Sequence, residues 1–168
     1  SADGRAALSE WLCPADRWMS AMKTNWVEMP PRPSLQASEN AVQAALACAQ
    51  QRGIAIAIMV VDSTGQLICG KRMDAARPIT AELALAKAHM AAIHQRPTHL
   101  FQKMVAPGEP AFGLQYHQAA GPGILPGGLP LTIDSSLCGA VGASGADRDG
   151  DLACAEAALA VLIQNRKH

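Results

Sequence analysis

The stretch of this chain that most restricts its fold is residues 127–145, "GGLPLTIDSSLCGAVGASG". It consists of two apolar segments separated by a short polar turn, which is typical of a β-hairpin, and Asp134 is its one charged residue. Glycine recurs along it, although buried strands are normally filled by larger side chains. Either neighbouring backbones pack closely against this hairpin, or a ligand lies against it.

The remaining segments supply helices and a second hairpin. We predict helices at residues 35–53, 74–96, 98–104 and 149–166. We predict strands at residues 54–62, 66–73, 129–134 and 137–145. Ser38 is the expected N-cap of the first helix, and Gly53 lies where a glycine commonly ends one. Hairpin-connected strands among helices indicate an α+β fold with an antiparallel sheet.

The N-terminal residues differ from the rest. They hold all three tryptophans, Trp11, Trp18 and Trp26, and end in the proline-rich stretch "PPRP". We therefore divide the chain into a Trp-rich N-terminal helical arm, residues 1–34, and a single domain, residues 35–168. Tryptophan is enriched where surfaces meet, so the arm is expected to pack on the domain or on a neighbouring subunit. The alternative is an additional core helix.

Composition argues against several classes of protein. Lys and Arg balance Asp and Glu at 14 each, without a basic stripe, so no nucleic-acid partner is expected. The chain contains no apolar run of about 18 residues, so no membrane span is predicted. No signal peptide is visible, although the chain begins with Ser rather than Met. The five cysteines are widely spaced without C-x-x-C, which favours reduced thiols, no structural metal and a cytoplasmic location.

No strong catalytic motif is present, so candidate site residues are taken from their position and chemistry. Arg72 ends a predicted strand and Lys87 lies in the following helix, so both could face one cleft and hold a carboxylate. Alternatively, Arg72 forms a structural ion pair with Asp74 or Glu82. His89 lies about 140° from His94 on the same helix, which argues against a two-histidine metal site.

Further candidates come from loops and glycines. His117 lies in a long Pro- and Gly-rich loop at residues 107–126, and it is an acid–base candidate together with Asp74. The remaining predicted ligand-binding residues are Phe101, Gly127, Gly128 and Gly145. At the glycines, a ligand could approach backbone N–H groups closely, and these groups could stabilise an oxyanion.

Three segments together resemble a known family. They are "IAIMVVDSTGQLICGKRMDAA" (56–76), "ALAKAHMAA" (84–92) and "PGGLPLTIDSSLCGAVGASG" (126–145), followed by an acidic and then alanine-rich helix. Between about residues 36 and 165 the chain resembles the GlcG/HbpS family, which includes the C-terminal domain of PduO-type proteins. The resemblance implies a profilin-like α+β fold with a five-stranded antiparallel sheet, and homo-oligomers from tetramer to octamer. It also implies association with haem, without identifying the iron ligands.

Two functions follow as hypotheses. The first is a small-molecule-binding protein that takes haem or a related tetrapyrrole as its cofactor. The second is an enzyme acting on a small carboxylate or ring-derived acid, with Arg72 and Lys87 holding the carboxylate. A scaffold that binds neither ligand is a third alternative.

Overall fold

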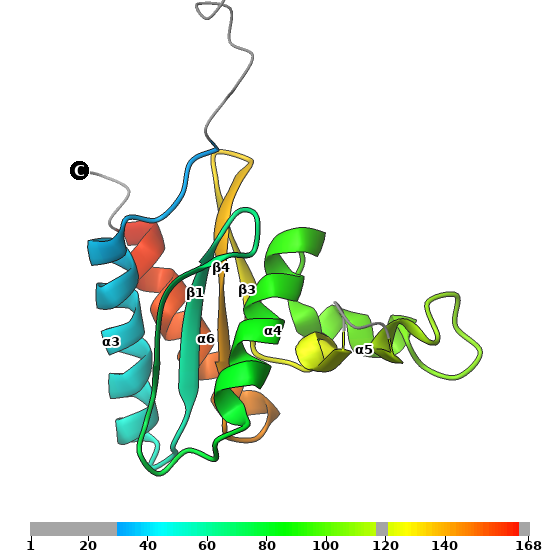
Figure 1. Ribbon diagram of the computed structural model, residues 1–168, viewed down its shortest axis with the longest axis horizontal. Coiled ribbons are helices and arrows are strands. Elements are labelled where there is room, and N and C mark those ends of the chain that lie inside the picture. The colour runs from blue at the N-terminus through cyan, green and yellow to red at the C-terminus, as the bar shows by residue number, and fades with distance from the viewer. Residues whose placement is uncertain (1–29, 117–120, 165–168) are drawn as a thin grey trace, which may run out of the picture.

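Two hairpins build an antiparallel sheet that carries helices on both faces (Figure 1). The computed structural model describes residues 30–116 and 121–164. The strands are β1 (Ala57–Asp62), β2 (Leu67–Arg72), β3 (Gly128–Ile133) and β4 (Ser136–Ser144). The helices are α3 (Leu35–Gln51), α4 (Thr80–His94), α5 (Phe101–Met104) and α6 (Arg148–Gln164). Short 3₁₀ segments are η1 (Thr98–Leu100), η2 (Leu114–Tyr116) and η3 (Gly121–Ile124).

The strand order is β2-β1-β4-β3, and each neighbouring pair is antiparallel. In β1, Val60 pairs with Cys69 of β2 on one side and with Val141 of β4 on the other. The predicted α+β fold with an antiparallel sheet is confirmed. The expected strand count was wrong, since the described residues form four strands rather than five. The described residues between α5 and β3 form turns and 3₁₀ segments, where the Pro- and Gly-rich composition predicts a loop.

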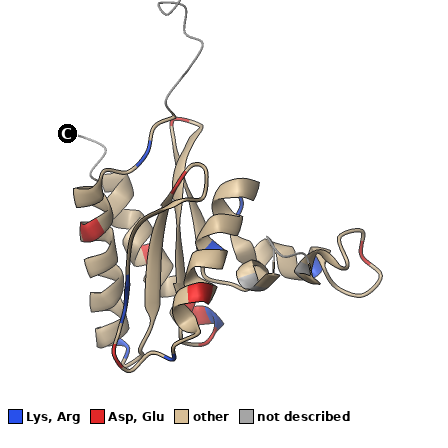
Figure 2. Ribbon diagram, in the orientation of Figure 1, with Lys and Arg blue, Asp and Glu red and all other residues tan. Residues whose placement is uncertain are grey.

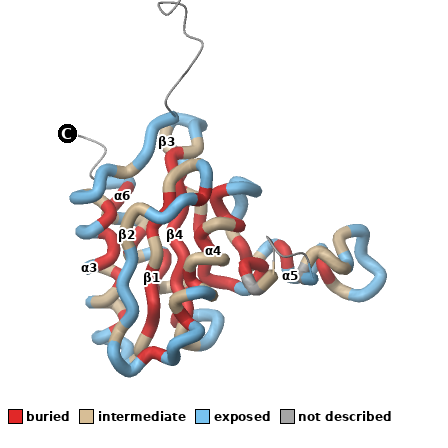
Figure 3. The backbone as a smooth tube through the Cα atoms, in the orientation of Figure 1, coloured by how far each residue is buried: buried red, intermediate tan, exposed pale blue. Residues whose placement is uncertain are grey.

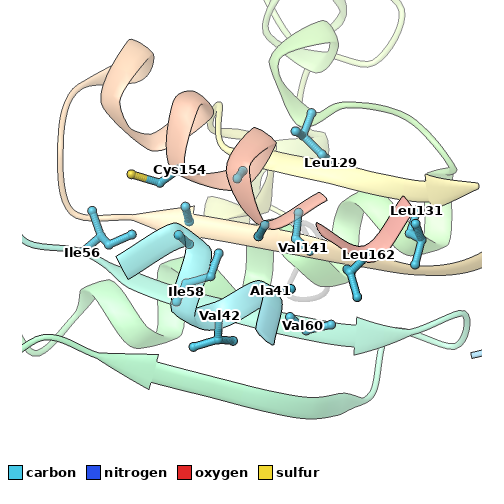
Figure 4. Packing of buried hydrophobic residues seen from close by; sticks show 14 of the residues in the cluster. Ala41, Val42, Ile56, Ile58, Val60, Leu129, Leu131, Val141, Cys154 and Leu162 are labelled. Carbon is cyan, nitrogen blue, oxygen red and sulfur yellow. The ribbon is translucent and has the colours of Figure 1, made fainter. Parts of the chain in front are cut away.

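The main core lies between the sheet and the helices α3 and α6. Alternate residues of a strand point to opposite faces, and Ile58 and Val60 of β1 face these two helices, fully buried. Figure 4 shows how side chains from sheet and helices meet there. Both helices contribute mainly small side chains to this core, so they lie close to the strands. Each fully buried aliphatic side chain contributes about 1.5–3 kcal/mol.

Helix α4 covers the opposite face of the sheet and packs there through alanines. Ala84, Ala88 and Ala91 are fully buried. A Cβ added at Gly142 of β4 would lie 2.6 Å from the backbone nitrogen of Ala88, and one at Gly128 of β3 would lie 2.9 Å from the carbonyl carbon of Lys87. The glycine-rich hairpin therefore leaves these two positions empty because the backbone of α4 occupies the space.

The outer strands of the sheet differ in how they are covered. In β2, Gly70, Lys71 and Arg72 are exposed, and Figure 3 shows this strand as much less buried than β1 or β4. At the other edge, β3 contains Pro130 in its interior, where the ring removes a backbone N–H donor. Exposed residues thus mark β2 as one edge of the sheet, and Pro130 suits β3 to the other edge.

The N-cap of helix α3 lies four residues earlier than the sequence suggested, although the helix begins at the predicted residue 35. Ser34, not Ser38, is its N-cap, and the hydroxyl of Ser34 accepts the N–H of Ala37 at 3.2 Å. Ser38 is buried within the first turns, where its hydroxyl donates to the carbonyl of Ser34 at 2.9 Å. The helix therefore begins at Leu35, directly after its cap, because Leu35, Gln36 and Ala37 all tolerate helical backbone. Residues 1–29 and His117 lie outside the described residues, so the arm and that catalytic candidate stay predictions.

Candidate functional site

A buried ion pair joins α4 to α6 at the end of the sheet. The side chains of Lys87 and Asp151 are only 3% and 6% exposed. Lys87 Nζ donates to Asp151 Oδ2 at 2.6 Å and to the carbonyl oxygen of Ala143 at 3.0 Å. Asp151 Oδ1 accepts the backbone N–H of Ala146 at 2.9 Å. The pair therefore connects α4, β4 and the chain entering α6.

The two charges of this pair depend on each other. Burial lowers the pKa of Lys87 and raises the pKa of Asp151, because removal from water disfavours both charged forms. The hydrogen bond and the opposite charge of the partner act in the other direction for each group. At a contact of 2.6 Å the ionised pair is favoured near neutral pH, but neither charge would be stable here alone.

Two glycines let the chain pass beside the ion pair. Gly127 has φ +114° and Gly145 has φ +147°, in a region that favours glycine. A Cβ at Gly127 would lie 2.5 Å from the carbonyl oxygen of Ala143 and 3.3 Å from Lys87 Nζ. A Cβ at Gly145 would lie 2.8 Å from the Cα of Ile56. Both glycines are required by close backbone approach around the pair.

A hollow of about 250 Å³ opens beside the pair, and we call it the Lys87 hollow. It is lined by Arg77, Leu83, Lys87, Gln102, Leu125, Pro126, Ser144, Gly145, Ala146, Asp147, Arg148 and Asp151. Figure 2 shows charged residues of both signs gathered around this end of the sheet, where α4 and α6 begin. The lining contains three cationic and two anionic side chains, so the hollow offers an excess of positive charge.

The structure brings together some predicted site residues and separates others. Lys87, Gly127 and Gly145 meet at the ion pair. Arg72 lies on the edge strand β2, and it is not part of the lining of the Lys87 hollow. Two other arginines, Arg77 and Arg148, line this hollow instead. The Lys87 hollow therefore does not contain Arg72, which the sequence analysis had placed in one cleft with Lys87.

The other candidates occupy different surroundings. Asp74 is exposed in the connection after β2. Phe101 is 3% exposed in a small core with Met90 and others, and its ring meets that of His94 edge-on at 5.1 Å. Gly128 donates its N–H to the Thr98 hydroxyl at 2.9 Å beneath α4. At Phe101 and Gly128, packing within the chain accounts for the residue type.

Asp151 is the site residue that the sequence analysis did not identify. Acidic residues in the first turn of a helix suit the helix dipole, which accounts for the exposed Asp149 but leaves the buried Asp151 unexplained. Helical spacing places Asp151 on the same face as Cys154, Ala155 and Ala158, all of them fully buried. An acidic residue on an apolar helical face predicts a buried partner, and this signal was available from the sequence.

A second hollow, of about 440 Å³, lies on the outer side of α4, and we call it the His89 hollow. It is lined by Gly65, Gln66, Leu67, Glu82, Leu85, Ala86 and His89. His89 Nδ1 lies 3.3 Å from the carbonyl oxygen of Gly65. Since a carbonyl oxygen only accepts, Nδ1 carries the proton in this contact, and in the neutral imidazole Nε2 then keeps its lone pair. Within the described part of the chain Nε2 has no hydrogen-bond partner.

Neither metal clusters nor membrane spans are found in the described ranges. No group of three or more His, Cys, Asp or Glu side chains in residues 30–116 and 121–164 is placed to hold a metal ion. No helix in these ranges combines the length and the apolar content needed to cross a membrane. Within the described residues, a metal site built from three or more such side chains is therefore not present.

Comparison with known proteins identifies the family. A family model described as "Haem degrading protein HbpS-like" matches residues 34–160, and the chain belongs to this HbpS-like family. The protein GlcG of Escherichia coli K12 is 35% identical over 96 residues, which cover 57% of this chain and 69% of GlcG. The resemblance to the GlcG/HbpS family, inferred from three sequence segments, is confirmed.

Solved structures agree with this assignment. The protein ORFY of Klebsiella pneumoniae has a TM-score of 0.79 and 29% identity, covering 83% of this chain and 97% of ORFY. The crystal structure of a PduOC:haem complex has a TM-score of 0.74 and 30% identity, covering 77% of this chain and 94% of that one. The fold of the described domain is thus shared with a relative that was crystallised with haem.

Proposed function

We propose that this protein binds haem or a related tetrapyrrole, and that His89 is the iron ligand. The observation that carries the proposal is the free Nε2 of His89, oriented by the Nδ1 contact with the carbonyl of Gly65. Imidazole nitrogen is a common haem ligand, and a backbone carbonyl on the opposite nitrogen is the usual way to fix its orientation. The similarity to the PduOC:haem complex supports the same ligand class.

The residues around His89 fit a flat, largely apolar ligand. Leu67 and Leu85 provide apolar surface beside the imidazole, and Leu67 is 52% exposed. Glu82 is the one charged residue in the lining, so the hollow itself offers the propionates no cation. The iron of the bound group would supply redox and ligand-exchange chemistry. This chain covers one side of the hollow, and we expect a second subunit to cover the other, consistent with a homo-oligomer.

Haem titration of the full chain tests this function. We expect a saturable shift of the Soret band at micromolar haem, and we expect His89→Ala to weaken binding at least tenfold. His94→Ala is the matched control, because His94 lies on the same helix, is exposed and does not line the hollow. Absence of saturable binding in the unmodified chain would refute the function. Equal binding by His89→Ala and His94→Ala would refute the site.

A second candidate function is supported by a different observation. An ammonium group has three N–H donors, and Lys87 uses two of them, on Asp151 and on Ala143. The third, together with Arg77 and Arg148, could hold a small carboxylate in the Lys87 hollow. In this version of the enzyme hypothesis, Asp151 replaces Asp74 as the acid–base group. Arg77 and Arg148 replace Arg72 because they line the same hollow as Lys87.

Calorimetric titration with a series of two- to four-carbon carboxylates tests this candidate. We expect Arg148→Gln and Arg77→Gln each to weaken binding roughly tenfold, as loss of one charge-assisted hydrogen bond implies. Arg96→Gln is the control, since Arg96 is exposed just after α4 and does not line the hollow. No carboxylate binding, or equal weakening in all three variants, would argue against a carboxylate site there.

A further inference from the structure

A third hollow, of about 420 Å³, lies at the point where the described chain begins. Pro31, Arg32, Pro33 and Ser34 form one wall of it. The opposite wall comes from Ala37 of α3, from the β3–β4 hairpin and from the end of α6, and it includes Leu131, Ile133, Cys138 and Leu162. We call this feature the N-terminal groove. Its size falls within the range of about 300–1,000 Å³ typical of ligand clefts.

The N-terminal groove is mainly apolar and is flanked by further apolar surface. Leu131 and Leu162, which line it, belong to the main core, so the groove reaches down to that core. Next to its lining residues along the chain, Leu35 is 57% exposed and Ile163 is 47% exposed. Apolar surface of this kind is stabilised when another apolar group covers it.

The chain itself leads into this groove. Figure 1 shows the segment before α3 running beside the turn between β3 and β4, and a Cβ at Gly139 would lie 3.3 Å from Pro33 Cδ. The prolines restrict φ along this segment and so restrict the direction in which the chain continues. Trp26 lies four residues before Pro30, and four residues span at most about 14 Å. The groove therefore lies within reach of its indole.

We propose that the N-terminal groove is the docking site of this chain's own segment 23–29, with the indole of Trp26 as its apolar anchor. Tryptophan combines a large apolar surface with one N–H donor, and it typically buries about 150–250 Å². The groove matches this chemistry, because its apolar base is bordered by polar groups such as the hydroxyl of Ser136. The segment lies outside residues 34–160 matched by the family model, so the proposal goes beyond what the family match describes.

Tryptophan fluorescence tests the proposal directly, because residues 1–29 hold all three tryptophans of the chain. In the full chain carrying Trp11→Phe and Trp18→Phe, Trp26 is the one fluorophore of this type. We expect its emission to be blue-shifted in the folded protein. We also expect acrylamide to quench it at least threefold less than in urea. Equal quenching in the folded and denatured chains would overturn the proposal.

Two groove variants and one control locate the contact. Ala37→Glu and Ser136→Arg introduce charge at two independent lining positions, and both should restore quenching to near the denatured level. Ala44→Glu is the control, because Ala44 is also half-buried, lies two turns further along α3 and does not line the groove. Circular dichroism verifies that each variant is folded. Quenching that is unchanged in both groove variants would refute the site.

Concentration dependence identifies whose groove holds the segment. Docking within one chain predicts that the shielding of Trp26 is the same from nanomolar to micromolar protein. Shielding that disappears on dilution would show that a second copy provides the groove, and would overturn docking within the same chain.

Discussion

Lys87 and His89 lie two residues apart on α4 and about 200° apart around its axis, and they have opposite environments. Lys87 points towards the sheet and α6, where Asp151 and the carbonyl of Ala143 bind it. His89 points outward, with one nitrogen on Gly65 and the other without a partner among the described residues. The comparison suggests that a polar side chain on the inner face of α4 holds the fold together. One on the outer face keeps an atom available for a ligand.

The largest expected effect comes from breaking the inner pair. Asp151→Ala would leave the buried ammonium of Lys87 uncompensated, and we expect the free energy of unfolding to fall by about 3–5 kcal/mol. Urea unfolding at pH 7 measures it. Asp149→Ala, exposed in the first turn of the same helix, should cost under about 1 kcal/mol. The double variant Lys87→Met/Asp151→Ala should recover most of the loss. Similar losses for Asp151→Ala and Asp149→Ala would contradict the role of the pair.

Gly127→Ala tests whether the backbone beside the inner pair has room for a side chain. The added Cβ would collide with the carbonyl of Ala143 and require alanine at φ +114°. We expect a loss of about 2–3 kcal/mol in the free energy of unfolding. At Gly108, with φ +91°, a Cβ would meet nothing within 4 Å. Gly108→Ala should therefore lose only about 1 kcal/mol, from strain alone. Equal losses at the two positions would show that space is not limiting at Gly127.

The pH dependence of Asp151→Asn sharpens the comparison further. Without the aspartate charge, desolvation alone would act on Lys87, and its pKa would fall further below the ordinary value of 10.5. Between the lowered pKa of Lys87 in the folded chain and its ordinary pKa in the unfolded chain, only the unfolded chain keeps this lysine protonated. The free energy of unfolding should therefore rise with pH across that window and level off above 10.5. The slope is at most about 1.4 kcal/mol per pH unit. If the free energy of unfolding, measured with urea, does not change with pH up to pH 10, the pKa of Lys87 is not lowered in this variant.

On the outer side of α4, the same type of test should show little change in stability. His89→Ala removes one half-buried hydrogen bond, and we expect the free energy of unfolding to fall by less than about 1 kcal/mol. Haem binding should nevertheless weaken at least tenfold, as in the titration proposed above. Thermal unfolding with and without haem measures both effects. A loss as large as that of Asp151→Ala would mean that the outer face is as structural as the inner one.

The smallest expected effect concerns the turn that presents Gly65 to His89. Burial acts to raise the pKa of Asp62, but hydrogen bonds from Thr64 and Gln66 hold it below its ordinary value of 3.8. A lowered folded pKa contributes stability that is present above 3.8 and is lost as pH falls through the folded value. Asp62 is largely solvated, so Asp62→Asn should cost under about 0.5 kcal/mol near pH 7. The difference from the unmodified chain should vanish once the pH falls below the folded pKa of Asp62, and acid titration of unfolding checks this.

Much of the fold could be predicted from local patterns, because hairpins and helices are encoded over short distances. The β-branched run of β1, the turn after it and the glycine-rich hairpin identified the strands. These local patterns predicted four strands, as observed, and the expected fifth strand came only from the family resemblance. Ser38 was assigned as an N-cap because two serines four residues apart, Ser34 and Ser38, both suit that role.

The site was harder to predict, because its partners are distant in the sequence. Lys87 was identified as a candidate, yet its partner Asp151 lies 64 residues away, and local rules favoured the nearer Arg72 as its companion. His89 was judged by its angle to His94 rather than by its contact with Gly65, which lies 24 residues away. Contacts that form only when a helix packs on the sheet can be identified only from the three-dimensional structure.

The exposed strand β2 affects how copies of this chain can meet. An edge strand presents unpaired N–H and C=O groups that can template cross-β growth between molecules. Here Lys71 and Arg72 put two like charges on that edge, and Gly70 weakens its β-propensity. Sheet-to-sheet extension would bring these cations of two copies together. These charges therefore disfavour edge-to-edge pairing of two copies through β2.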